Sequence, residues 1–157
     1  MNTTTLRAEP QQNAVIRRRE FQYITEMASG GKLLLRVLIG ALVLLHGIAK
    51  LKTGVGPVMG MLAQQGLPPE LAYFVYVGEV VAPVMMIIGI WTRFAALVVA
   101  GNMIVAVVLA HVPQLLLLND QGGWALELQA MFLFGALSVM MLGAGRYSAG
   151  GALGRWN

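Results

Sequence analysis

Six side chains suited to proton exchange or ligand binding stand within or beside the apolar stretches of this sequence: His46, Lys50, Glu79, Asn102, His111 and Glu127. Glu79 is the most informative of them, because it lies near the middle of residues 71–91, a stretch of 21 almost wholly apolar residues. A helix of that length is about 30 Å long, which matches the hydrocarbon thickness of a bilayer. A carboxylate at that depth costs about 2.5–3.5 kcal/mol on insertion scales. Glu79 is therefore predicted to face a partner or a water-filled cavity rather than lipid.

Glu79 and His46 are the predicted catalytic pair. A carboxyl and an imidazole placed together can pass protons to and from a ligand where water is scarce. A contact with His46 or Lys50 is the least costly way to satisfy Glu79 inside a membrane. Ligand binding is predicted to involve Lys50, His111, Glu127 and Asn102, and no metal site is predicted.

The composition indicates a membrane protein. Of the 157 residues, 57% are hydrophobic and only 11% are charged, and the mean hydropathy is +0.70. Soluble domains carry about 25% charged residues. The chain has no cysteine, which excludes disulfides, thiolate metal sites and iron–sulfur clusters ligated by this chain. Its net charge of +4 is not interpreted as a sign of nucleic-acid binding, because in a membrane protein the position of basic residues matters more than their sum.

The apolar stretches predict four membrane-spanning helices, over residues 32–51, 71–91, 94–112 and 124–142. Together they predict an all-α four-helix bundle as one transmembrane domain, residues 32–143. Pro83 lies four residues after Glu79 and cannot donate to its carbonyl, so a kink is expected there. Pro57 can open, and Gly66 can close, a short interfacial helix between the first two spans.

Polar segments flank this domain on both sides. Residues 1–31 form an extension whose first 12 residues are predicted to be disordered. Within it, Phe21, Ile24 and Ala28 recur at helical spacing beside three arginines, which favours a further interfacial helix. Residues 144–157 are predicted to form a glycine-rich tail.

Basic residues are distributed unevenly between the two sides of this topology. With the N-terminus inside, nine Lys and Arg residues fall on the inner side, and only Lys50 and Lys52 fall on the outer side. The positive-inside rule then predicts that both termini are cytoplasmic. Arg36 and Lys50 lie near opposite ends of the first span, from which both side chains can snorkel toward the interfaces, so neither residue needs a functional explanation when taken alone. The same topology places an ionisable group from every helix in the outer half of the membrane.

The order and spacing of several short motifs resemble the DoxX family of small four-helix membrane proteins, over roughly residues 33–148. These motifs are Arg36 with Gly40, HGIAKL at residues 46–51, Glu79, GIWTR at 89–93, His111, Gly123 with Glu127, and GAGRYS at 143–148. The chain departs from the family pattern at residues 80–83, where small residues are usual, and at Ala149, where an aspartate is usual. The resemblance implies a bundle in the bacterial cytoplasmic membrane. Some members are similar to the small subunit of thiosulfate:quinone oxidoreductase, and others associate with enzymes of oxidative or sulfur stress.

Three functions are compatible with these observations. The first is a membrane anchor or subunit of a redox complex, held by lipid and by a protein partner or a second copy of the chain. The second is a quinone-reactive subunit of an oxidoreductase, with an outer-leaflet pocket in which Glu79 and His46 exchange protons. The third is a haem protein with His46 and His111 as axial ligands; it is the weakest, because Lys50 is a poor neighbour for a porphyrin and the two histidines are expected at different depths.

Overall fold

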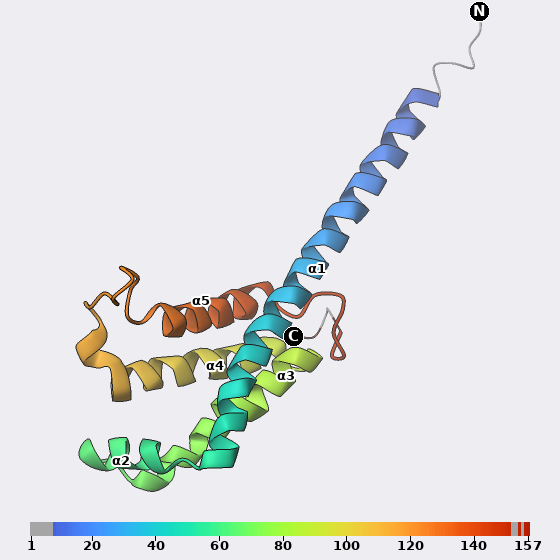
Figure 1. The fold of residues 1–157 in the computed structure, drawn as a ribbon. Coiled ribbons are helices and arrows are strands. Elements are labelled where there is room, and N and C mark those ends of the chain that lie inside the picture. The colour runs from blue at the N-terminus through green and yellow to red at the C-terminus, as the bar shows by residue number, and fades with distance from the viewer. Residues whose placement is uncertain (1–7, 152–153, 155) are drawn as a thin grey trace, which may run out of the picture.

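The computed structural model describes residues 8–151, 154, 156 and 157, with side chains from residue 12 onward. The described residues form helices and no named strand (Figure 1). In chain order the elements are α1 (Ala8–Thr53), α2 (Gly56–Gln64), the 3₁₀-helix η1 (Pro69–Phe74), the π-helix η2 (Val77–Val81), α3 (Ala82–Ile88), α4 (Thr92–Ala106), the π-helix η3 (Val107–His111), the 3₁₀-helix η4 (Val112–Gln114) and α5 (Glu127–Leu142).

Three helical segments among the described residues are long and apolar enough to cross a membrane: residues 12–53, 69–88 and 92–114. α5 is also apolar, but it has only 16 residues. It begins three residues later than the predicted fourth span, because Trp124 belongs to a turn that is bridged to Leu118. The crossing by α5, the side on which the termini lie and the interfacial position of α2 stay predictions.

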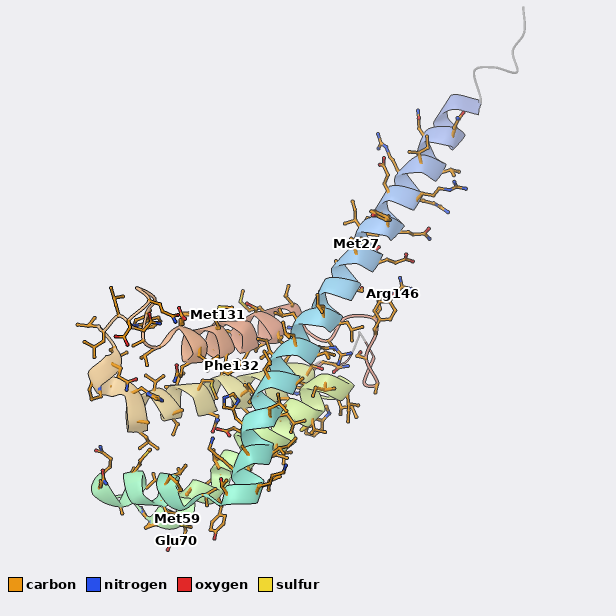
Figure 2. The ribbon with its side chains drawn as sticks, in the orientation of Figure 1. Met27, Met59, Glu70, Met131, Phe132 and Arg146 are labelled. Carbon is orange, nitrogen blue, oxygen red and sulfur yellow. The ribbon has the colours of Figure 1, made fainter. Side chains whose placement is uncertain are left out.

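α1 is a single helix of 46 residues, whereas the sequence predicts a span only over residues 32–51. The extension is rich in Glu, Gln and Arg, which favour helix, and Gly30–Gly31 does not interrupt it. Of the residues predicted to be disordered, 1–7 lie outside the described residues and 8–12 form the first turns of α1. Figure 1 shows that this half of α1 projects away from the other helices, and Figure 2 shows its side chains, Met27 among them, standing apart from the bundle.

The remaining part of α1 closes a bundle with α3, α4 and α5. α1 and α4 each contact both α3 and α5. The core of the bundle contains many small residues, and Ala95, Ala96 and Ala136 are fully buried. Such residues let helices approach closely when lipid supplies no hydrophobic drive for their association. Large apolar side chains instead cover the outside of the bundle, as expected for helices surrounded by lipid.

Arg36 does not snorkel toward an interface; it is buried, with 2% of its surface exposed. Its Nη1 donates to the carbonyls of Met86 (2.8 Å) and Ile87 (2.9 Å) at the end of α3, and its Nη2 donates to the carbonyl of Tyr147. The tail folds back and supplies the Tyr147 acceptor. Arg36 therefore joins α1, the C-terminal end of α3 and the tail.

The tail itself is held against the turn between α3 and α4. Gly150 N–H donates to the Gly89 carbonyl (3.0 Å), which continues the attachment begun at Tyr147. The Thr92 hydroxyl donates to Asn157 Oδ1 (2.9 Å), and Arg93 Nε donates to the Asn157 backbone oxygen (3.0 Å). Its described residues thus pack on the bundle.

Arg36→Lys is expected to destabilise the protein by about 1–2 kcal/mol, because a lysine ammonium cannot reach both groups of carbonyls that the planar guanidinium bridges. The tail should then detach, so tryptic cleavage after Arg146 should accelerate along with the fall in unfolding temperature. Arg146→Lys is the control, since Arg146 is exposed and its carboxylate partner Glu26 is 4.0 Å away. Equal stability of the wild type and Arg36→Lys would contradict the bridging role.

Candidate functional site

A cavity of about 150 Å³ lies where α1, η2, α4, η3 and α5 meet. Apolar atoms form most of its lining, although five of the ten lining residues have polar side chains. The polar side chains are His46, Lys50, Glu79, His111 and Gln129, and the apolar ones are Val43, Met103, Ala106, Leu128 and Phe132. We refer to it as the Lys50–Glu79 cavity. Four of the six residues proposed from the sequence therefore face one space.

An ion pair between Lys50 and Glu79 forms one wall of this cavity. Lys50 Nζ lies 2.7 Å from Glu79 Oε1 and 2.5 Å from Oε2, so the ammonium contacts both carboxylate oxygens. Asn102 Nδ2 approaches Oε1 at 3.4 Å. The Glu79 side chain is 6% exposed and that of Lys50 is 29% exposed, so the cation lies toward the mouth and the carboxylate lies inside. A charged pair in this geometry satisfies a carboxylate that would otherwise be costly to bury.

Both π-helices carry an ionisable residue into the cavity. η2 contains Glu79 and precedes Pro83, which supplies no N–H to the Glu79 carbonyl. η3 ends at His111, two residues before Pro113. A π-turn inserts one residue into the helical repeat and re-aims the side chains that follow, and such turns are frequent at functional sites. The irregularity expected at Pro83 thus lies in the turn before the proline, where Glu79 is.

Two glycines allow the helices to meet at this point. A Cβ on Gly47 would lie 2.2 Å from the Glu79 carbonyl oxygen, and a Cβ on Gly78 would lie 2.5 Å from the Asn102 side chain. Real side chains do not tolerate these distances, so only glycine fits at either position. Gly47 therefore brings α1 against the backbone of η2, which places Lys50, one turn later, beside Glu79.

His111 links the cavity to the loop that follows η4. Its Nδ1 lies 3.0 Å from Gln114 Oε1, and its Nε2 lies 3.2 Å from Gln129 Nε2. Gln129 Oε1 is buried and has no hydrogen-bond partner within the described residues.

His46 lines the cavity but does not pair with Glu79, which takes Lys50 instead. His46 Nδ1 lies 3.0 Å from the carbonyl of Leu42 on its own helix. Its ring meets the Phe132 ring edge-on, with centroids 5.6 Å apart; Figure 2 labels Phe132 on α5. Because Nδ1 donates to Leu42, Nε2 is the nitrogen with a free lone pair.

The structure does not bring Glu127 to this cavity. Glu127 is exposed in the first turn of α5, where a carboxylate interacts favourably with the helix dipole. A Cβ at Gly123 would lie 2.8 Å from its Oε2, so it sits against the preceding loop. The part assigned to it in ligand binding stays a prediction.

Gln129 and Phe132 line the cavity and were not anticipated from the sequence. Residues 127 and 129 lie two positions apart on α5 and therefore point in very different directions. The charged residue selected from the sequence, Glu127, has its side chain on a different side of the helix from Gln129. The signal that could have identified Gln129 is that it is a lone amide in the apolar stretch that follows Glu127.

The size and the donor set of the cavity limit what could bind. Pockets for drug-sized ligands measure about 300–1,000 Å³, so a porphyrin does not fit a cavity of about 150 Å³ although His46 and His111 both line it. Within the described residues, no cluster of three or more His, Asp or Glu side chains could hold a metal ion. A cavity of this size can hold a single six-membered ring.

A family model described as DoxX matches residues 31–112, slightly more than half of the chain. The matched region extends from α1 to η3 and contains five of the six residues proposed from the sequence, all except Glu127. Gln129 and Phe132, on α5, lie beyond its end. A comparison with curated proteins and with solved structures finds no match. The helical bundle and this match together establish that the chain belongs to the DoxX family.

Proposed function

We propose that this DoxX-family membrane protein is a subunit of an oxidoreductase complex and binds the head ring of a quinone in the Lys50–Glu79 cavity. The observation that carries the proposal is the cavity itself, because it combines ring-sized dimensions with an ion pair, two imidazoles and the Gln129 amide. A helix bundle that served only as an anchor has no need of such a space. We place the protein in a bacterial cytoplasmic membrane with both termini inside, so that the cavity lies in the outer half.

The two kinds of lining match the two parts of a quinone ring. Phe132, Met103 and Val43 offer apolar and aromatic surface to the ring faces. Lys50 can donate to one quinone carbonyl. On the α5 side, Gln129 Nε2 has a second N–H besides the one that faces His111, and this N–H can donate to the second carbonyl of the quinone. The site therefore has a donor for each carbonyl of the quinone.

Proton exchange accompanies the electron transfer. Reduction of a quinone adds two electrons and two protons, and it leaves two hydroxyl groups where two carbonyls were. The electrons come from a redox-active partner subunit. The protons pass through Glu79 and His46, which line the cavity on neighbouring elements and can each hold one. His111 and Gln114 extend a chain of hydrogen-bonding groups from the cavity to the loop.

Glu79→Gln is expected to slow the oxidation of bound quinol about 10²-fold or more, since it removes a general base but keeps the shape of the side chain. The measurement is single-turnover oxidation of a tail-less dimethoxy-methyl benzoquinol by ferricyanide, with protein in excess. Two ferricyanide ions accept two electrons, and two protons are released. Binding, followed by quenching of tryptophan fluorescence, should change little.

Glu70→Gln is the matched control, because Glu70 is an exposed carboxylate on η1 outside the cavity. An unchanged rate in Glu79→Gln would rule out the proton role of Glu79. Failure of the wild type to bind the benzoquinone at all would rule out the quinone site.

A second candidate function, a non-catalytic anchor, is favoured by the projecting half of α1. Residues 12–28 expose apolar side chains, including Phe21, Tyr23, Ile24 and Met27. Figure 2 shows Met27 on the part of α1 that projects from the bundle. Such a helix can hold a partner subunit. A partner that co-purifies in mild detergent, and a complex that remains fully active with Glu79→Gln, would favour the anchor over the quinone site.

A further inference from the structure

A second hollow, a groove of about 200 Å³, shares the lining residue Gln129 with the Lys50–Glu79 cavity. α4, η3, the following loop and α5 form it. Its lining is apolar except for Gln129 and comprises Ile104, Val107, Val108, Leu115, Trp124, Leu126, Ala130, Leu133 and Phe134. We call it the α4–α5 groove.

The groove and the cavity share structural elements as well as one side chain. Gln129 lines both hollows. η3 contributes Val107 and Val108 to the groove and His111 to the cavity, so the π-turn separates an apolar side from a polar one. Gln129 Nε2 is held by His111, at 3.2 Å, which fixes the amide at the boundary. A polar space and an apolar space thus meet at one ordered side chain.

A ligand that fills both hollows must have a polar ring at one end and a hydrocarbon chain at the other. We propose that the α4–α5 groove holds the first part of the tail of the quinone whose head ring occupies the cavity. The inference rests on the proposed function and narrows its substrate class to lipid-soluble quinones with an isoprenoid or alkyl tail. Gln129 then acts as a positioning residue where ring and tail join.

The loop after η4 closes one end of the groove. Trp124 Nε1 donates to the Leu115 carbonyl (2.8 Å), and both residues line the groove. Leu118 and Trp124 are also paired in a short bridge. This loop holds Leu115 and Trp124 in place, so the groove has a defined shape. Shape matters here because a tail leaving lipid for the groove gains little from the hydrophobic effect alone.

Ala130→Phe should fill the groove and leave the cavity open, since Ala130 lines only the groove. We expect it to weaken binding of a decyl-tailed benzoquinone about tenfold or more, because the added ring would occupy the space that the tail needs. Binding of the tail-less benzoquinone with the same ring should change less than about twofold. Met131→Phe is the matched control, because Met131 is exposed and lines neither hollow.

The outcomes separate this inference from the proposed function. If Ala130→Phe leaves the decyl quinone unaffected, or weakens both quinones equally, the tail does not lie in the groove, whereas the ring site stands. If neither quinone binds the wild type, the proposed quinone site is wrong, and the inference about the tail is wrong with it.

A measurement on the unmodified protein covers the case in which Ala130→Phe does not fold. A quinone with a photoreactive diazirine on the first carbons of its tail should label peptides from residues 104–108 and 130–134. Labelling confined to the outer surface of α1 would overturn the inference, because no residue of α1 lines the groove.

Discussion

Replacing Lys50 by methionine is expected to destabilise the protein by up to about 3–5 kcal/mol, the cost of leaving one charge of a fully buried ion pair without its partner, because the Glu79 side chain is only 6% exposed. Methionine keeps the length of the side chain and suits a membrane, so packing is largely preserved. What is lost is the cation 2.5 and 2.7 Å from the two oxygens of Glu79. Asn102, at 3.4 Å, cannot replace it. The measurement is denaturant unfolding in detergent, followed by circular dichroism.

The double variant Lys50→Met/Glu79→Gln tests the cause of that loss. Once the carboxylate is gone, no uncompensated charge remains, so the double variant should be markedly more stable than Lys50→Met alone. Lys52→Met is the control for removing a lysine from the end of α1, because Lys52 is exposed. If Lys50→Met and the double variant were equally unstable, the stability would come from the packing of Lys50 and not from its charge.

The two members of the pair are not equivalent, and burial explains why. Lys50 is 29% exposed and can turn toward the mouth of the cavity when Glu79 is neutralised. The Glu79 side chain, 6% exposed on η2, has no such route. Glu79→Gln should therefore be folded well enough for its quinol kinetics to be measured, whereas Lys50→Met should not serve as a kinetic probe.

The helical class and the membrane character could be predicted from the sequence, because hydropathy over a window of about 20 residues reports them directly. The extent of α1 could not. The predicted span begins at Lys32 because the preceding residues are polar. The backbone hydrogen bonds of a helix form in water as well as in lipid, so the helix extends beyond the apolar stretch. The structure of the tail was missed for a different reason. Its attachment depends on carbonyls that only the complete fold brings to Arg36.

The site was predicted in part, for physical reasons that can be traced. A carboxylate in an apolar stretch must find a partner, and this identified Glu79 with Lys50 among its candidate partners. The expected depth of a residue in the membrane does not show in which direction its side chain points. Two π-turns shift the repeat around Glu79 and His111, so counting in steps of 3.6 residues fails there. Gln129 was not predicted, because an uncharged amide in an apolar stretch indicates a site less strongly than a carboxylate such as that of Glu127.

Gly47→Val is expected to destabilise the protein by more than about 3 kcal/mol, at or beyond the usual upper limit for overpacking. A Cβ at this position would lie 2.2 Å from the Glu79 carbonyl oxygen and 2.7 Å from Val80 Cγ2. The first contact is with backbone, which cannot move aside by a change of rotamer. α1 and η2 would have to separate, and Lys50 would be carried away from Glu79. The unfolding temperature should therefore fall, and benzoquinone binding should be lost.

Two further variants show whether backbone contact is the cause. Gly101→Val, on α4, is the control for placing a β-branched residue in a helix, because a Cβ there meets nothing within 4 Å. Adding Val80→Ala to Gly47→Val removes the side-chain clash and leaves the carbonyl clash, so it should not restore stability. Recovery by Val80→Ala would mean that the two helices are held apart by a side chain that can be trimmed. In that case the Glu79 backbone would not fix the distance between α1 and η2, and the placement of Lys50 beside Glu79 would have to depend on the ion pair itself.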